Sequence, residues 1–303
     1  MGKKIKKIDI YEKTHRILYS FGAIVKFVSF LCVKKEHVKI IKKGKLPKPP
    51  YLLLSNHASF MDIYVAMVAT GIHRPYWVCA AEEFVDKNFV CRWSGVMPKR
   101  RYIADARSNQ MMMDILTKRK KVLVMYPESI WSYAGITERF DHNVAKFAKH
   151  ARVPIVFINC HGHYLRQPQW GDQKIRKVSP MYAEVKTLLT KKQIDNFSFE
   201  DIDEAITQAM QYDEEQYQLD NNIKIDYPKR AEGLENLLYK CPHCGKEYEM
   251  TSKDDILSCK ACGVSYRLKE DGTLECLNNP AKFHRISEWY AYEKDCVKQE
   301  IDA

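Results

Sequence analysis

The sequence predicts an α/β protein in which helices flank a central sheet, with a helix before the sheet and a small metal-binding module after it. Three observations lead to this fold class. Short apolar runs alternate with helical stretches between residues 51 and 159, which is typical of sheets covered by helices. Two Cys-x-x-Cys pairs stand near the carboxyl-terminal end. The 303 residues are 46% hydrophobic, enough for one large core and a small appendage, which excludes a disordered protein.

The first predicted element is a helix over residues 17–33. This apolar run contains Lys26 and is short for a bilayer-spanning helix, so a spanning segment is not favoured. No small-residue cleavage site follows the run, and we therefore expect no secretory signal. The flanks are rich in lysine, and Lys26 lies off the apolar stripe, which predicts a helix in a membrane interface; packing on the domain is the alternative. The stripe consists of Ile17, Leu18, Phe21, Ile24, Val25, Val28, Leu31 and Cys32.

The elements that follow are separated by turn and breaker residues. Three prolines within residues 39–50 predict a linker without regular structure. Apolar runs predict strands at residues 51–55, 76–80, 121–126 and 153–159. Helical patterns stand at residues 63–70, 105–118, 144–150, 199–219 and 288–300. We divide the chain into an amphipathic segment at 1–38, a main domain at 39–196, a helical connector at 197–240, a cysteine module at 241–276 and a final helix at 277–303.

The turn after the first buried strand carries His57 and Asp62. Two residues five positions apart diverge on a regular helix, so their side chains can meet only if His57 precedes the helix. Ser59 has the character of an N-cap, which places Asp62 at the helix start, where its carboxylate can reach back to the imidazole. A histidine oriented in this way is a general base for a hydroxyl group. The alternative is that Asp62 only completes a capping box with Ser59 and that His57 is a loop histidine.

Asn56 and His57, followed by four residues and Asp62 directly after an apolar strand, resemble the first motif of the glycerolipid acyltransferases, typified by 1-acylglycerol-3-phosphate acyltransferase. The resemblance implies the sheet of that family flanked by helices. It also implies that His57 deprotonates an acceptor hydroxyl, which attacks an acyl thioester, while Asp62 orients the histidine. Asn56 is expected to line the substrate site.

Three later segments resemble the remaining blocks of the family in the same order. Gly95 and the basic residues Lys99, Arg100 and Arg101 are similar to the second block, which binds the phosphate of the acceptor; an exposed basic turn is the alternative. Pro127 and Glu128 match the start of the third block. Glu128 is expected either to bind an acceptor hydroxyl or to brace the loop backbone.

The third block departs from the family after Glu128. Trp131 stands where a second phosphate-binding arginine is expected, and an indole cannot make a bidentate phosphate contact. Either Arg139 or one of residues 99–101 replaces that arginine, or the acceptor is not a simple glycerol phosphate. The fourth block corresponds to residues 153–156, at the start of a predicted strand.

The second group of candidate functional residues consists of two Cys-x-x-Cys pairs, each followed by glycine and separated by 14 residues. This spacing predicts a zinc ribbon in which four thiolates surround a structural ion, and unconnected thiols or disulfides are the alternative. His161 and His163 lack an evident carboxylate partner, so we do not expect them to bind metal. The expected zinc ligands are Cys241, Cys244, Cys259 and Cys262.

The net charge of +11 suggests an anionic partner, which can be nucleic acid, an anionic membrane face or a phosphorylated substrate. The ribbon segment at residues 241–262 carries three lysines against four carboxylates, so nucleic-acid binding through it is not favoured. We therefore expect an O-acyltransferase at the cytoplasmic face of a membrane that uses acyl-CoA or an acyl-carrier protein and most simply makes phosphatidic acid. A relative with a different acceptor is the main alternative, and a basic zinc-ribbon protein that binds nucleic acid is a weaker one.

Overall fold

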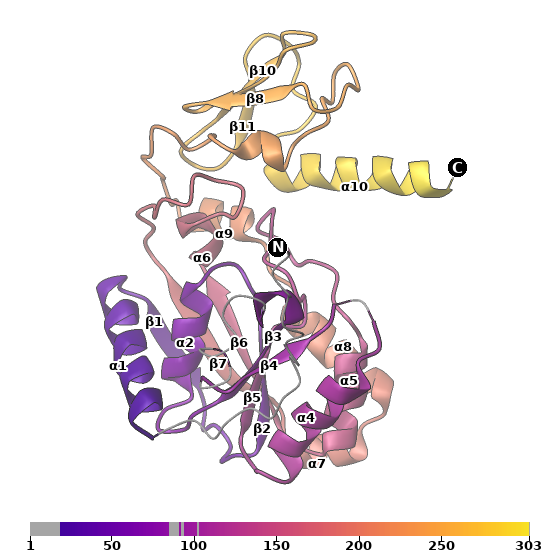
Figure 1. The fold of residues 1–303 in the computed structure, drawn as a ribbon. Coiled ribbons are helices and arrows are strands. Elements are labelled where there is room, and N and C mark those ends of the chain that lie inside the picture. The colour runs from indigo at the N-terminus through magenta and orange to yellow at the C-terminus, as the bar shows by residue number, and fades with distance from the viewer. Residues whose placement is uncertain (1–18, 85–90, 92–93, 102, 303) are drawn as a thin grey trace, which may run out of the picture. The chain divides into compact units, whose positions relative to one another are not determined.

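A computed structural model describes residues 19–84, 91, 94–101 and 103–302 of the chain. It divides into two compact units whose segments interleave along the sequence (Figure 1). The first unit comprises Met1–Ile130, Arg139–Asn159 and Ala183–Met210. The second comprises Trp131–Glu138, Cys160–Tyr182 and Gln211–Ala303.

A seven-stranded sheet forms the centre of the first unit, and this confirms the predicted α/β class. Strand β2 pairs in parallel with β5 and β6, and β3 pairs in parallel with β4 and β5. The carboxyl ends of these five strands therefore lie at one edge of the sheet, where α/β folds place their ligands. In spatial order the strands are β1 (Lys39–Lys43), β7 (Tyr182–Leu189), β6 (Ile155–His161), β2 (Tyr51–Ser55), β5 (Val122–Met125), β3 (Tyr76–Ala80) and β4 (Val96–Lys99).

Helices cover both faces of this sheet. In Figure 1, α1 and α2 lie together on one side, and α4, α5, α7 and α8 lie on the other. The middle strands are buried on both faces, which is why β2 and β5 consist almost wholly of apolar residues. The helices of this unit are α1 (Tyr19–Lys35), α2 (Met61–Ala69), η1 (Ala81–Glu83), α4 (Ala106–Thr117), α5 (Asn143–Ala151), α7 (Lys191–Asn196) and α8 (Phe199–Met210).

Several boundaries differ from the sequence prediction. The predicted linker contains β1, an edge strand that the prolines only follow, so the expectation of no regular structure there is wrong. The single helix predicted at 199–219 is two helices, α8 and α9 (Glu214–Asp220), because the Asp213 side chain accepts the Gln216 backbone N–H and starts a new helix. Strands β4 and β7 were not predicted, since their short or half-polar runs carry a weak periodic signal.

Helix α1 presents its apolar side to solvent and a charged side chain to the domain. Lys26 is half-buried and donates to the carbonyl oxygen of His73 at 2.9 Å. Burial, with Arg74 and Lys42 nearby, lowers the pKa of Lys26 to about 8. The exposed apolar residues of α1 are Ile24, Phe27, Val28, Phe30 and Leu31.

The predicted stripe of α1 is therefore right in part. Ile24, Val28 and Leu31 are exposed as a stripe, whereas Val25 and Cys32 are half-buried. Ile17, Leu18 and the side chain of Phe21 lie outside the described part of the chain. Among the described helices, none is both long enough and apolar enough to cross a membrane.

The second unit is built around a four-stranded antiparallel sheet and a long carboxyl-terminal helix. Trp289 and Tyr266 are fully buried in its core, with ring centroids 5.1 Å apart. Its strands run in the spatial order β11 (Leu274–Cys276), β10 (Ser265–Leu268), β9 (Ile256–Cys259) and β8 (Met250–Lys253). Its helices are α6 (His163–Arg166), α9, η2 (Leu234–Asn236) and α10 (Ile286–Asp302).

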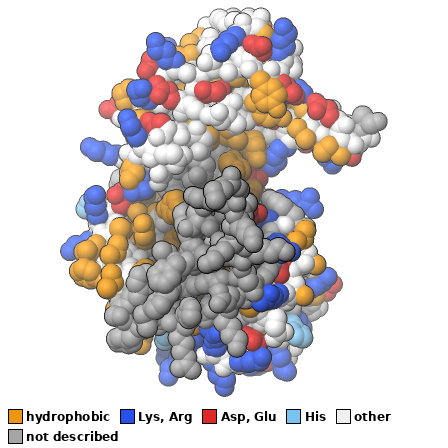
Figure 2. Space-filling model, in the orientation of Figure 1, with side chains coloured by type: hydrophobic (Ala, Val, Ile, Leu, Met, Phe, Trp, Pro, Cys, Tyr) orange, Lys and Arg blue, Asp and Glu red, His pale blue; other side chains and the backbone are white. Residues whose placement is uncertain are grey.

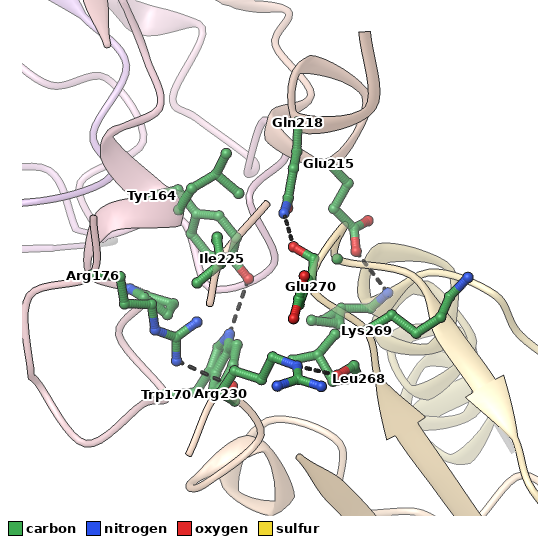
Figure 3. Close-up of a pocket in the computed structure, with 14 residues that line it drawn as sticks. Tyr164, Trp170, Arg176, Glu215, Gln218, Ile225, Arg230, Leu268, Lys269 and Glu270 are labelled. Carbon is green, nitrogen blue, oxygen red and sulfur yellow. Dashed lines mark hydrogen bonds between the residues drawn. The ribbon is translucent and has the colours of Figure 1, made fainter. Parts of the chain in front are cut away.

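A small cavity of about 30 Å³ lies inside the second unit (Figure 3). Hydrogen bonds close its wall: Trp170 donates to the Tyr164 hydroxyl, Arg176 to the Arg230 carbonyl oxygen and Gln218 to the Glu270 carbonyl oxygen. This volume holds only a few water molecules. The cavity is a packing gap between the last turn of the sheet and the neighbouring helices, and none of the candidate catalytic residues lines it.

A buried carboxylate joins α9 to the start of α10. Glu215 accepts the backbone N–H of Ile286 at 2.8 Å and that of Ser287 at 3.1 Å, and it also accepts the Ser287 hydroxyl. Arg285 forms an ion pair with Glu215 at 3.3 Å. Burial raises the pKa of Glu215, and the bonds from Ser287 together with the charge of Arg285 oppose that shift. These contacts satisfy N–H groups that the first turn of a helix cannot pair internally.

We expect Glu215→Ala to lower the free energy of unfolding of the second unit by about 2 to 4 kcal/mol, because it leaves buried donors without an acceptor. Chemical denaturation followed by tryptophan fluorescence, to which the buried Trp170 and Trp289 of this unit contribute, measures this change. Glu200→Ala, which removes an exposed carboxylate in the first turn of α8, is the control and is expected to change stability by less than about 0.5 kcal/mol. Equal stability of the Glu215 variant and the wild type would contradict this role.

Candidate active site and metal centre

His57 lies in the turn that connects the carboxyl end of β2 to the start of α2. β2 is a central strand whose five residues are all buried, so the turn leaves the sheet at a rigid position. Asn56 is 1% exposed, whereas the His57 side chain keeps 13% of its surface accessible. The turn therefore places the His57 imidazole at the edge of the sheet where ligands bind, while Asn56 is buried in the domain.

One carboxylate oxygen of Asp62 organises this turn. Oδ2 accepts the backbone N–H of Ala58 at 2.6 Å and that of Ser59 at 2.9 Å, and it lies 3.2 Å from Nδ1 of His57. Asp62 is 1% exposed. The two interpretations from the sequence are therefore compatible, because the same oxygen binds backbone N–H groups at the helix start and contacts the imidazole.

The start of α2 differs in detail from the predicted capping box. The helix begins at Met61, and Phe60 occupies the N-cap position without a side-chain hydrogen bond. The Ser59 hydroxyl accepts the Met61 N–H at 3.2 Å. In a capping box it would accept the N–H of the next residue, Asp62. Asp62 stands in the first turn, where a carboxylate also interacts favourably with the helix dipole.

The loop after β5 contacts His57 from a second direction. The rings of His57 and Tyr126 are stacked, with centroids 3.9 Å apart and planes at 19°. Glu128 accepts the backbone N–H of His57 at 3.2 Å and is itself 2% exposed. Of the two roles expected for Glu128, this contact is the one that braces the backbone.

No role for Tyr126 was expected from the sequence, because its place beside His57 depends on which strands are neighbours in the sheet. In the parallel register of β2 and β5, Leu54 is opposite Met125, so the residues after the two strands are neighbours. The order of the strands is needed for this inference. It is a long-range pairing that local periodicity does not contain.

The basic residues of the second block lie at the same edge of the sheet as His57 but farther along it. Lys99 ends β4 and is half-buried, whereas Arg100 and Arg101 are exposed. With β5 and β3 between β2 and β4, a strand spacing of about 4.8 Å puts this segment roughly 14 Å from the end of β2. The Asp105 carboxylate accepts the Arg100 backbone N–H at 3.2 Å and the Ser108 N–H at 3.1 Å, which anchors the segment to the start of α4.

Arg139, one of the expected alternatives to the missing arginine, is exposed just before α5 in the first unit. Trp131 belongs to the second unit and is half-buried. His163 is also in that unit and fully buried. His161 lies against the rings of Tyr182 and Tyr217, and its Nδ1 is 3.9 Å from a carboxylate oxygen of Glu214, so the expectation that it has no carboxylate partner is wrong.

The four cysteines of the two Cys-x-x-Cys pairs converge on one point in the second unit. Their sulfur atoms all lie within 4.8 Å of one another, with Cys241 and Cys262 3.7 Å apart and Cys244 and Cys259 3.8 Å apart. A tetrahedral ion with Zn–S bonds of about 2.3 Å requires S···S distances of about 3.8 Å, whereas a disulfide requires about 2.05 Å. The cluster fits zinc with four protein ligands, and such a site has no open position for a substrate.

Backbone geometry on both sides of the cluster is the same. Gly245 donates its N–H to the Cys241 carbonyl oxygen at 2.9 Å, and Gly263 does the same to Cys259. Both glycines have positive φ angles, of 73° and 76°, which side chains with a Cβ rarely adopt. The glycine after each Cys-x-x-Cys pair is therefore required by the turn that brings the two thiols together.

Comparisons with known proteins agree with these two sites. Residues 37–161 match the family model described as acyltransferase, and residues 236–268 match a family model of a zinc ribbon domain. The first range contains all four blocks singled out from the sequence, and the second contains all four cysteines. These two segments of the chain are therefore similar to the families that the sequence motifs suggested.

One similar solved structure is that of the 1-acyl-sn-glycerophosphate (LPA) acyltransferase from Thermotoga maritima. The two chains are 16% identical, and the match has a TM-score of 0.49. It covers 63% of this chain and 76% of that one. A search of the curated proteins found no match.

We expect Cys259→Ser to lower the zinc content from one ion per chain and to loosen the second unit, because binding energy in a closed site is largely folding energy. Elemental analysis measures the metal, and acyl transfer at low temperature measures whether the chemical step survives. Cys276→Ser removes a cysteine of the same sheet outside the cluster, and this control is expected to keep the ion. A zinc-free but folded preparation that loses the chemical step and regains it with zinc would contradict a structural role.

Proposed function

We propose that this protein is an O-acyltransferase that transfers a fatty acyl group from an acyl thioester to the hydroxyl of a lysophospholipid. The match of residues 37–161 supports the acyltransferase family. The observation that carries the reaction is the contact between His57 and Asp62 at the carboxyl edge of the sheet, with the imidazole partly accessible and the carboxylate buried. This is the arrangement of a general base with its orienting group.

In the proposed reaction, Asp62 accepts the N–H at Nδ1 of His57 and so keeps the lone pair on Nε2. Nε2 takes the proton of the acceptor hydroxyl as its oxygen attacks the thioester carbonyl carbon. The tetrahedral intermediate then collapses with cleavage of the C–S bond. The imidazolium returns the proton to the departing thiolate, so the products are an ester and a free thiol and His57 is regenerated.

The acceptor that we propose is 1-acylglycerol-3-phosphate, which would give phosphatidic acid, and the donor is acyl-CoA or an acyl-carrier protein. Lys99, Arg100 and Arg101 supply positive charge at the correct edge of the sheet, and Arg139 is a further exposed cation in the same unit. Asn56 is buried beside His57 and would shape the site rather than present a charge. Trp131 in place of the expected arginine keeps a second possibility open, a related acceptor with a different headgroup.

We further propose that the protein works at the cytoplasmic face of a membrane and binds it peripherally through α1. Figure 2 shows hydrophobic side chains gathered over this helix. The basic residues Lys34 and Lys35 end the helix, and exposed lysines follow on β1. Apolar side chains that enter the interface next to lysines that attract anionic lipid make up a two-part membrane anchor.

We expect His57→Ala to lower kcat/KM by about 100-fold or more without unfolding the protein, because the base acts in the transition state and alanine keeps the backbone N–H bonds to Asp62 and Glu128 that hold the turn. Acyl transfer is measured with a radiolabelled thioester donor, and folding by circular dichroism. His150→Ala, at an exposed position of α5, is the matched control and should keep full activity. Full activity of purified His57→Ala on the best substrate would sink the mechanism. Lipid mass spectrometry of a host that overproduces the wild type or His57→Ala identifies the acceptor.

The double variant Phe27→Ser and Leu31→Ser should bind anionic vesicles at least about tenfold more weakly, since it removes exposed apolar area and leaves the inner face of α1 intact. Removal of residues 1–35 should release the protein altogether. Vesicle sedimentation at several fractions of anionic lipid measures both effects. Ile301→Ser changes an exposed apolar residue of α10 and is the control. Unchanged sedimentation of both α1 variants would exclude this anchor.

A further inference from the structure

The face of the His57 ring is covered by a side chain that has no assigned role in the reaction. Tyr126 is 9% exposed and stacks on the imidazole, with ring centroids 3.9 Å apart and planes only 19° from parallel. Both residues stand just after the carboxyl ends of neighbouring parallel strands, so sheet hydrogen bonds set their separation. The contact therefore belongs to the rigid centre of the first unit.

The contact with Asp62 holds the His57 ring at one atom. Asp62 lies against Nδ1, whereas Glu128 holds the backbone N–H of the same residue. The ring can still turn about its Cα–Cβ and Cβ–Cγ bonds within the range that this hydrogen bond tolerates. A flat ring against its face blocks this rotation and fixes the direction in which Nε2 points.

We infer that Tyr126 is a positioning residue for His57, and that its aromatic face rather than its hydroxyl is what the reaction needs. The inference rests on the proposed role of His57 as general base. Displacement of a reacting group by about 1 Å can cost about 100-fold in rate. Loss of the ring at residue 126 is therefore expected to lower kcat while both substrates still bind.

Three variants test this inference. Tyr126→Phe keeps the ring and should keep kcat within about twofold of the wild type. Tyr126→Leu removes the ring and should lower kcat by about 10- to 100-fold, with the KM for donor and acceptor unchanged. Tyr51→Leu removes another buried tyrosine at the opposite end of β2, so it should lower thermal stability and leave kcat unchanged. All rates are measured well below the lowest unfolding temperature of the set.

A double-mutant cycle separates positioning from a general effect on the fold. In the His57→Ala background, Tyr126→Leu should cost no further activity, because the group that it positions is absent. The inference is overturned if Tyr126→Leu keeps its kcat, if it acts only through KM, or if it costs the same factor with and without His57. Full activity of His57→Ala would instead overturn the proposed function itself, so the two failures are distinguishable.

Discussion

The buried carboxylate of Asp62 is the constraint on which the candidate active site depends. A carboxylate that is 1% exposed needs hydrogen-bond donors around it, and the turn before α2 supplies the N–H groups of Ala58 and Ser59. Binding both of them fixes the backbone between His57 and the helix. The same oxygen then lies 3.2 Å from the imidazole. One carboxylate therefore holds the start of the helix, the path of the turn and the orientation of the proposed base. A change at Asp62 alters all three.

Parallel pairing extends this local arrangement across the sheet. Because β2 and β5 run in the same direction, the loop that carries Tyr126 and Glu128 emerges beside the turn of His57, although Glu128 is 71 residues farther along the chain. The ring face, the backbone N–H and Nδ1 of the histidine are each held by a different residue. In the second unit, too, residues that are distant in the sequence are brought together by the backbone. Two short turns with left-handed glycines place the four thiols within 4.8 Å of one another.

In helix α1 a charged side chain faces the domain while several apolar side chains face solvent. The sequence predicted a helix with lysines at its end, and α1 is such a helix, but the half-buried ammonium of Lys26 faces the domain and bonds to a backbone carbonyl oxygen. Phe27 and Phe30, which the predicted stripe did not include, are exposed instead. A helical stripe identifies two faces, and only the packing partner decides which face is inside. Here the partner is α2, and the turn after its carboxyl-terminal end offers an acceptor for the ammonium group.

The sequence by itself determined the α/β class, the His57 and Asp62 pair and the four cysteines, because each depends on local periodicity or on spacing within a turn. Only the tertiary structure showed which residues the third block contacts. The order of the strands decides which residues are neighbours at a sheet edge, and no local sequence pattern contains that order. The stacking of Tyr126 on His57 and the hydrogen bond from the His57 N–H to Glu128 could therefore not be predicted from the sequence. The edge strand β1 and the break before α9 were missed for a related reason. Pairing with β7 makes β1 a strand despite its charged composition, and a single cap at Asp213 divides a continuous helical pattern.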